Sequence, residues 1–265
     1  MVKIIVTITA FLISLICLAQ VSETREVTDF SKLRVSNSID VFYTISDKIS
    51  VKVETDDNEK LKLIKTEVEK GTLKLYVDTK GYKQKETKKG NKRSNISFIN
   101  GVDFQVLKIT VSGPNLVEIK ASSSADVKIE NTNKSSNLDV AVSSSGSISG
   151  SFNCTDLTID ASSSGDFTGK INAASVGIES SSSSDVNLSG RATKISVKAS
   201  SSSDCNLKDF TVEEAIIGAS SSADVSIKVT KSIEAKASSS ASISYYGNPL
   251  EVKKEESSSG SVKSK

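Results

Sequence analysis

The stretch Ala121-Ser122-Ser123-Ser124-Ala125-Asp126-Val127 decides the fold, because close copies of it return along the rest of the chain. The first serine of each copy lies 18 to 21 residues after the previous one, and most steps are 19 residues. These serines are Ser122, Ser143, Ser162, Ser181, Ser200, Ser220, Ser238 and Ser257. A fixed period of this length is typical of a solenoid, in which each repeat forms one turn of a coil.

Apolar and polar residues alternate within each copy. Every second residue from Val117 reads Val, Ile, Ala, Ser, Ala, Val and Ile, and the residues between are mostly Glu, Lys, Ser, Asp and Asn. Strict alternation predicts strands with one buried face. The small residues at the centre, with Ser123 as an inward residue, predict a bend where two walls of the coil meet.

Stacking the copies in register places Val on Val and Ser on Ser. We therefore predict an all-β chain folded as a single-stranded parallel β-helix with an N-terminal strand-rich cap. Neighbouring strands lie about 4.8 Å apart, so eight turns would span roughly 38 Å. A disordered, serine-rich stalk is the alternative for this composition, but disorder gives no reason to keep a two-residue register through the copies.

Residues 1–19 have the pattern of a signal peptide. Lys3 supplies the positive start, Ile4–Leu18 the apolar stretch and Ala19 the small residue before cleavage. The apolar stretch is shorter than the roughly 20 residues that span a bilayer. We expect a protein exported to the periplasm, the outer surface or the medium, with no transmembrane segment in its mature chain.

The chain divides into three parts. Residues 1–19 are the signal peptide, residues 20–112 hold a first turn, a hairpin and a basic loop of the same domain, and residues 113–265 form regular turns with a C-terminal cap. Phe30–Ile45 is a divergent first turn, because Ser36-Asn37-Ser38-Ile39-Asp40-Val41 mirrors the core of the repeat.

Strand patterns outside the repeats indicate the two caps. Leu61–Val68 and Thr72–Val77 read as a hairpin, and Phe104–Val111 reads as one strand. Near the C-terminus charged residues replace apolar ones from Val252 onward, which predicts a solvated capping turn. We expect Val262–Lys265 to be frayed.

Charge and cysteine spacing argue against a nucleic-acid partner and against a disulfide. Lys and Arg number 34 against 32 Asp and Glu, which gives no reason to expect a nucleic-acid partner. Cys154 and Cys205 are separated by more than two turns, about 10 Å, beyond the roughly 7 Å limit for a disulfide. We predict that both are unpaired and that Cys205 is a small core residue.

The chain has no histidine, so an imidazole base, a histidine-containing triad and a histidine metal site are excluded. Carboxylates remain, because one outward place beside the bend holds Asp in five copies: Asp126, Asp166, Asp185, Asp204 and Asp224. Three of them, Asp166, Asp185 and Asp204, fall on consecutive turns. The interpretation favoured here is that each accepts hydrogen bonds from backbone N–H groups at its bend. A Ca²⁺ ladder and direct ligand contact are the alternatives.

A basic stretch runs from Lys80 to Arg93. It reads as a solvated insertion, or as a contact with an anionic surface polymer. The candidate contact residues are Lys83, Lys85, Lys88, Lys89, Lys92 and Arg93.

Three features together resemble a known family: Val35–Tyr43, the segment Ile109–Leu116 that leads into the repeats, and the Ser-Ser/Gly-Ala/Gly-Asp repeats themselves. They resemble the head GIN domain family of exported bacterial proteins, described as putative auto-transporter adhesins, from about Phe30 to Pro249. The resemblance implies a right-handed β-helix of pectin-lyase-like shape and a role in adhesion. It implies no catalytic residues.

We therefore predict a non-catalytic adhesin or cell-envelope binding module without a cofactor. Its expected partner is a surface polysaccharide or another component of a host or bacterial cell surface. Two other classes stay open: a polysaccharide lyase or hydrolase on the same architecture, for which no carboxylate pair stands out, and a purely structural surface spacer.

Overall fold

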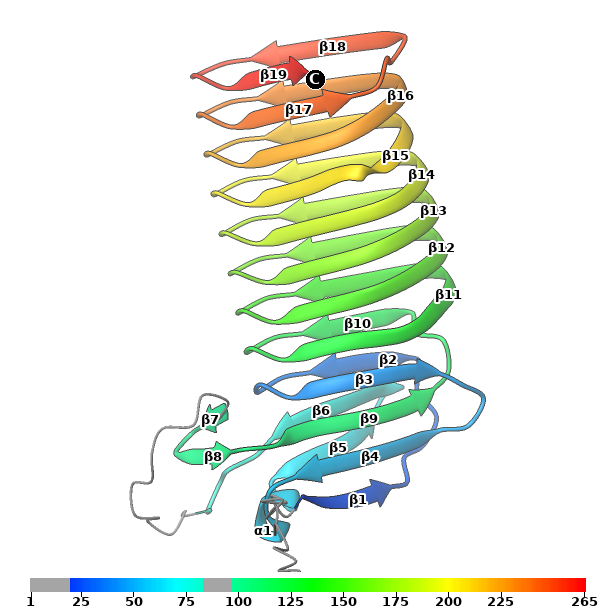
Figure 1. The fold of residues 1–265 in the computed structure, drawn as a ribbon, viewed down its shortest axis with the longest axis vertical. Helices are drawn as coiled ribbons and strands as arrows, with labels where there is room; N and C mark the ends of the chain where they lie inside the picture. The colour runs from blue at the N-terminus through cyan, green and yellow to red at the C-terminus, as the bar shows by residue number, and fades with distance from the viewer. Residues whose placement is uncertain (1–19, 83–96) are drawn as a thin grey trace, which may run out of the picture.

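The computed structural model describes residues 20–82 and 97–265 and shows a parallel β-solenoid standing on an N-terminal cap (Figure 1). The predicted signal peptide lies outside the described residues. Within the described chain, 17 strands join one sheet that winds around a single apolar cluster running from Phe30 to Val262. The predicted parallel β-helix with turns of about 19 residues is confirmed.

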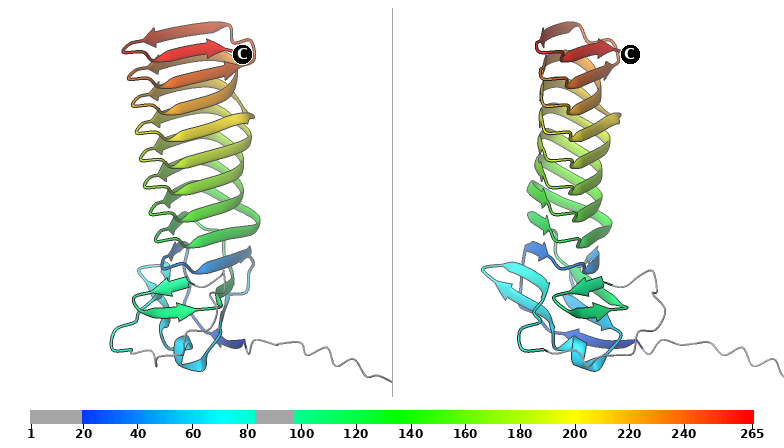
Figure 2. Two further views of the ribbon diagram at one scale, coloured as in Figure 1. Left: turned by 60° about the vertical axis from the view of Figure 1, so that its left-hand side comes forward. Right: turned by 90° about the vertical axis from the view of Figure 1, so that its left-hand side faces the viewer.

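Six long, bent strands form the regular part of the solenoid. Each runs along one wall, turns a rounded edge and returns along the other wall, and each pairs in parallel with the next (Figures 1 and 2). We call the wall built from the beginnings of these strands the first wall and the wall built from their ends the second wall. The strands are β11 (Asp126–Val142), β12 (Ser147–Ala161), β13 (Asp166–Ser180), β14 (Asp185–Ala199), β15 (Asp204–Ala219) and β16 (Asp224–Ala237).

A tight serine turn joins the second wall to the first wall in every copy. Two consecutive serines, such as Ser123 and Ser124, have φ values of 54° and 59°, in the left-handed region. The amide of Ala125 donates to the carbonyl of Ser122 (3.2 Å), which closes a turn of type I′. The amide of Ser124 donates to the carbonyl of Ser144 in the next copy (2.9 Å), so the turns also bond to one another along the stack.

This geometry corrects the expected bend. Ser123 is exposed at the tip of the turn and does not point inward, whereas Ala121 and Ala125 on either side of the turn are buried. The place after the turn is small because it packs on the backbone of the preceding copy. A Cβ atom on Gly165, which occupies this place two copies later, would lie 2.7 Å from the carbonyl carbon of Val142 in the copy before it.

The divergent first copy of the repeat, Phe30–Ile45, has the same design. β2 (Lys32–Val35) and β3 (Asp40–Ile45) are joined through Asn37 and Ser38, which have φ values of 65° and 53°. β2 pairs in parallel with β10 (Glu118–Ala121), and β3 pairs with β11. The first turn therefore lies between the regular copies and the cap.

The cap covers the N-terminal end of the stack. The predicted hairpin is present as β5 (Ile64–Glu69) and β6 (Thr72–Val77), and β6 pairs with β2. The predicted strand 104–111 is instead two strands, β8 (Val102–Phe104) and β9 (Leu107–Gly113). The other cap elements are β1 (Val21–Arg25), β4 (Ser50–Thr55), α1 (Asn58–Leu61) and β7 (Ser97–Ile99).

The opposite end of the stack carries β17 (Ser242–Tyr246), β18 (Glu251–Glu256) and β19 (Ser261–Ser264). Every residue of β18 is exposed, as expected for a solvated capping turn. The expectation that Val262–Lys265 fray was wrong. β19 pairs with β17, which buries Val262 to 4% exposure.

Cys154 and Cys205 are both buried and unpaired, as predicted. Burial raises the pKa of the Cys205 thiol to about 12 and that of Cys154 to about 11. No helix in residues 20–82 and 97–265 has the length and apolar character needed to cross a bilayer.

Candidate functional site

A column of carboxylates runs along the first wall beside the serine turns. The strand register stacks Asp166 on Asp185, Asp185 on Asp204 and Asp204 on Asp224. Four consecutive copies therefore carry Asp at this place, one more than the sequence analysis counted. Asp126 and Asp40 form a second pair nearer the cap. Ser147 separates the two groups.

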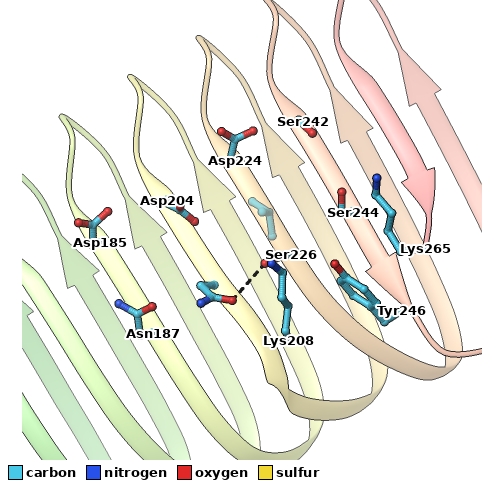
Figure 3. Close-up of a pocket in the computed structure, with 12 residues that line it drawn as sticks. Asp185, Asn187, Asp204, Lys208, Asp224, Ser226, Ser242, Ser244, Tyr246 and Lys265 are labelled. Carbon is cyan, nitrogen blue, oxygen red and sulfur yellow. Dashed lines mark hydrogen bonds between the residues drawn. The ribbon is translucent and has the colours of Figure 1, made fainter.

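A second polar column lies two residues further along each strand. Asn187 and Asn206 are stacked there, and the hydroxyl of Ser226 donates to Asn206 Oδ1 (3.4 Å). The two columns line a groove of about 540 Å³ over β14 to β17 (Figure 3). We call it the carboxylate groove. It is lined by Asp185, Asn187, Asp204, Asn206, Lys208, Asp224, Val225, Ser226, Ser242, Ser244, Tyr246 and Lys265.

The stacking of like charges disfavours ionisation. Partial burial raises the pKa of Asp204, and the neighbouring carboxylates of Asp185 and Asp224 raise it further. Burial likewise raises the pKa of Asp166, with a second contribution from Asp185. Ionisation of carboxylates in this column therefore costs free energy in the folded protein.

The aspartates do not cap the turns, which corrects the interpretation favoured from the sequence. Across the described parts of the chain, no carboxylate of the five repeated aspartates accepts a hydrogen bond from a turn amide. These are Asp126, Asp166, Asp185, Asp204 and Asp224. The amides already have partners: the backbone N–H of Asp185 donates to Gly165 O (3.1 Å), and that of Ser183 donates to Ser201 O (3.0 Å). Because these groups are satisfied by the backbone, the carboxylates of the column are left facing solvent, and all five residues are exposed.

The other sequence candidates are placed as follows. Asp166, Asp185 and Asp204 lie in one column, as expected. Over residues 20–82 and 97–265, no three His, Cys, Asp or Glu side chains are arranged to hold a metal ion. The basic candidates lie outside the described residues, so ligand contact through them stays a prediction: Lys83, Lys85, Lys88, Lys89, Lys92 and Arg93.

The second column and the end of the groove were not predicted from the sequence. Asn187 and Asn206 recur two places after the repeated Asp, a signal present in the sequence. Tyr246 and Lys265 carry no such signal, because they belong to the last copies, where the repeat decays.

Comparisons with known proteins agree with this architecture. The sequence profile of the family described as "Putative auto-transporter adhesin, head GIN domain" matches residues 29–249. No curated protein matches the chain.

Solved structures share the fold. A "putative lipid binding protein" from Parabacteroides distasonis is 23% identical with a TM-score of 0.80, covering 93% of this chain and 96% of that chain. A "putative adhesin" from Parabacteroides merdae is 16% identical with a TM-score of 0.80 and the same coverage. A "putative adhesin" from Bacteroides fragilis is 22% identical with a TM-score of 0.63, covering 93% of this chain and 97% of that chain. At these identities the likeness concerns the fold alone.

Proposed function

We propose that this chain, which belongs to the family described as "Putative auto-transporter adhesin, head GIN domain", is a non-catalytic binding module of the cell envelope. Its ligand contact is the carboxylate groove of the first wall. The family description names adhesion and export, and the fold offers a long, repetitive surface of the kind that binds extended ligands. The predicted signal peptide supports export to the periplasm, the outer surface or the medium.

A run of stacked carboxylates without ion pairs in residues 20–82 and 97–265 is the observation that carries this proposal. Several exposed charges on the second wall form ion pairs, such as Lys198 with Glu179 (2.8 Å) and Lys194 with Glu214 (3.1 Å). Asp139 and Asp160 on that wall have no ion pair among the described residues, but they do not stack on each other. Asp166, Asp185, Asp204 and Asp224 on the first wall have no ion pair within the part of the chain that the structure describes. An arrangement of residues that lowers stability without a structural gain is retained mainly at functional sites.

The groove suits a polar polymer. Each copy contributes at least two polar side chains to it: an Asp and an Asn from β14 and from β15, Asp224 and Ser226 from β16, and two serines from β17. A polymer lying along the stack therefore meets a pair of hydrogen-bonding groups at every copy. Such weak contacts reinforce one another because the second and later contacts are intramolecular. We take the ligand to be a polysaccharide whose hydroxyl or amino groups donate to the carboxylates, with Tyr246 offering an aromatic face at one end.

The groove does not suit an acyl chain, although lipid binding is named for the Parabacteroides distasonis neighbour. Charged and polar side chains line almost all of it, and Val225 is its one aliphatic lining residue in the described chain. Catalysis is also disfavoured, because the aspartates of the column occupy equivalent places and no pair is set apart as acid and base.

The test is a binding measurement on the full chain with a panel of surface polysaccharides, repeated with the double variant Asp204→Asn/Asp224→Asn. Losing two central carboxylates should weaken binding by about tenfold or more. Asp160→Asn, which removes an exposed carboxylate from the second wall, should bind as the unmodified chain does.

Two results would replace the proposal. New reducing ends or unsaturated products that disappear in a single-carboxylate variant would identify a polysaccharide hydrolase or lyase. Binding to no surface component, or equal binding by the double variant, would favour a structural spacer or another face.

A further inference from the structure

We propose that the rounded edge carries a second binding site, separate from the carboxylate groove, that takes the carboxylate group of an acidic saccharide. The site is a groove of about 580 Å³ across β11 to β15, lined by Thr132, Ser151, Phe152, Asn153, Lys170, Ile171, Asn172, Gly190, Arg191 and Thr211. We call it the corner groove. Its volume is in the range of small-ligand sites.

A missing side chain shapes this edge. One column that runs inward at the edge is Phe152, Ile171, Gly190 and Phe210, in successive copies. The three side chains are buried, with exposures of 0% or 1%, and at Gly190 the column has none. Gly190 has φ +107°, and a Cβ atom there would lie 2.1 Å from Ile171 O. The backbone of β14 therefore lies directly over that of β13, in a place where only glycine fits.

A hydrogen-bonded row orients the cation beside this glycine. Asn153, Asn172 and Arg191 stack in successive copies. Asn172 Nδ2 donates to Asn153 Oδ1 (3.4 Å), and Arg191 Nε donates to Asn172 Oδ1 (3.1 Å). One edge of the guanidinium is thereby fixed, and its two terminal nitrogens have no protein partner among the described residues. They are the donors that bind a carboxylate in bidentate fashion.

The charge of the corner groove is unbalanced. Lys170 and Arg191 both line it and no Asp or Glu does. Neither cation forms an ion pair anywhere in residues 20–82 and 97–265, whereas Lys194 and Lys198 on the same strand as Arg191 are both paired. A groove that carries two unpaired cations is complementary to an anionic ligand.

The remaining lining groups favour a saccharide as the carrier of that anion. Asn153, Thr132 and Thr211 supply the amide and hydroxyl groups that match sugar hydroxyls. The side chains of Phe152 and Ile171 are buried beneath them in the core. The stacked row repeats these groups from copy to copy, which suits an oligomer lying along the edge.

The experiment measures binding of a hexuronate trisaccharide and of its neutral methyl ester to the full chain by calorimetry. The two probes share their sugar rings and differ at the carboxyl groups, which the ester neutralises and caps with methyl groups. We expect the acid to bind at least about tenfold more tightly than the ester, with the difference abolished in Arg191→Gln and reduced in Lys170→Gln. Arg191→Lys keeps the charge but not the bidentate geometry and should recover only part of the affinity.

Lys198→Gln is the matched control, because it removes an exposed cation from the same strand on the second wall. It should bind both probes as the unmodified chain does, and all variants should share its melting temperature within a few degrees.

Equal affinity for acid and ester, or full affinity in Arg191→Gln, would overturn the proposal. Binding to vesicles with anionic lipid that requires Arg191, without binding of the trisaccharide, would also overturn it. Asp204→Asn/Asp224→Asn leaves the corner groove intact, so failure at one groove is distinguishable from failure at the other.

Discussion

At the scale of single residues, the serine turns are the most unusual feature of the chain. Type I′ turns normally use Asn and Gly, because both central residues have positive φ. Here serine holds both places in each repeat copy, for example Ser201 and Ser202 with φ values of 55° and 59°. The bonds between successive turns offset this strain, since the amide of Ser202 donates to Ser221 O (3.0 Å).

We predict that Ser201→Val destabilises the protein by about 1–2 kcal/mol, because a β-branched residue tolerates the left-handed region poorly. Ser201→Gly should stay within about 1 kcal/mol of the unmodified chain, since relief of strain offsets the added freedom of the unfolded state. Ser196→Val is the control. Ser196 is exposed on a strand, where valine is favoured. Urea denaturation measures all three, and equal midpoints for Ser201→Val and Ser196→Val would contradict the turn assignment.

The carboxylate column makes stability depend on pH. The pKa of Asp204 is raised in the folded state, mainly by burial and then by Asp185 and Asp224. The stabilising protonated form is fully present below the unfolded pKa of about 3.9, and its contribution is lost as pH rises through the folded pKa. Asp204→Asn should therefore raise the free energy of unfolding at pH 7, on the order of a few tenths to 1 kcal/mol, and give no gain at pH 3.

The control for this measurement is Glu179→Gln, which removes a carboxylate that is already paired with Lys198 (2.8 Å). It should give no gain at pH 7. Equal effects of the two substitutions at both pH values would show that the column carries no excess repulsion.

At the scale of the strand, the register decides which residues form the core. Ile159, Ile178 and Val197 stack in successive copies on the second wall, each with an exposure of 0% or 1%. Glu179, the next residue, faces solvent. Because side chains alternate with a period of two, a shift of one residue would exchange the buried and exposed faces of the whole strand.

We predict that Ile178→Asp lowers the free energy of unfolding by more than about 3 kcal/mol. It loses the roughly 1.5–3 kcal/mol of a buried aliphatic side chain and adds an unpaired carboxylate to the core. Glu179→Ser should change it by no more than about 0.5 kcal/mol. Denaturation midpoints compare the two, and similar midpoints would refute the register.

At the scale of the whole molecule, the two ends of the stack differ. The cap covers the N-terminal end of the stack (Figure 2). At the other end, every residue of β18 is exposed. Each copy of a solenoid contacts only its neighbours, so opening starts at the less protected end and propagates. Cys205 in β15 lies nearer the C-terminal end than Cys154 in β12, which makes the two thiols reporters of the order of opening.

In the native protein at pH 8 both thiols should react slowly with a disulfide reagent, because burial raises the pKa of Cys205 to about 12 and that of Cys154 to about 11. We predict that the chain without residues 1–19, and therefore without Cys17, is labelled at a lower urea concentration when it carries Cys154→Ala, which reports on Cys205, than when it carries Cys205→Ala. Labelling of both at one concentration would mean that the solenoid unfolds as a single unit.

The sequence by itself determined the solenoid, its period and the buried face of each strand. Local alternation fixes which residues can be buried, and a repeated pattern allows only stacking in register. It also placed Asp166, Asp185 and Asp204 in one column, since the register follows from the repeat. The family resemblance rested on the same residues.

Only the tertiary structure decided what happens at the two edges of the solenoid. A two-residue turn leaves the alternation in phase, so the sequence pattern reads the same whether Ser123 is an inward bend or an exposed turn tip. The grooves likewise join residues from several copies. The carboxylate groove needs Tyr246 and Lys265 from copies where the repeat has decayed. The corner groove depends on Gly190, which fits there because Ile171 O from the preceding copy lies against it. Contacts between copies, rather than the order of residues within one copy, determine these features.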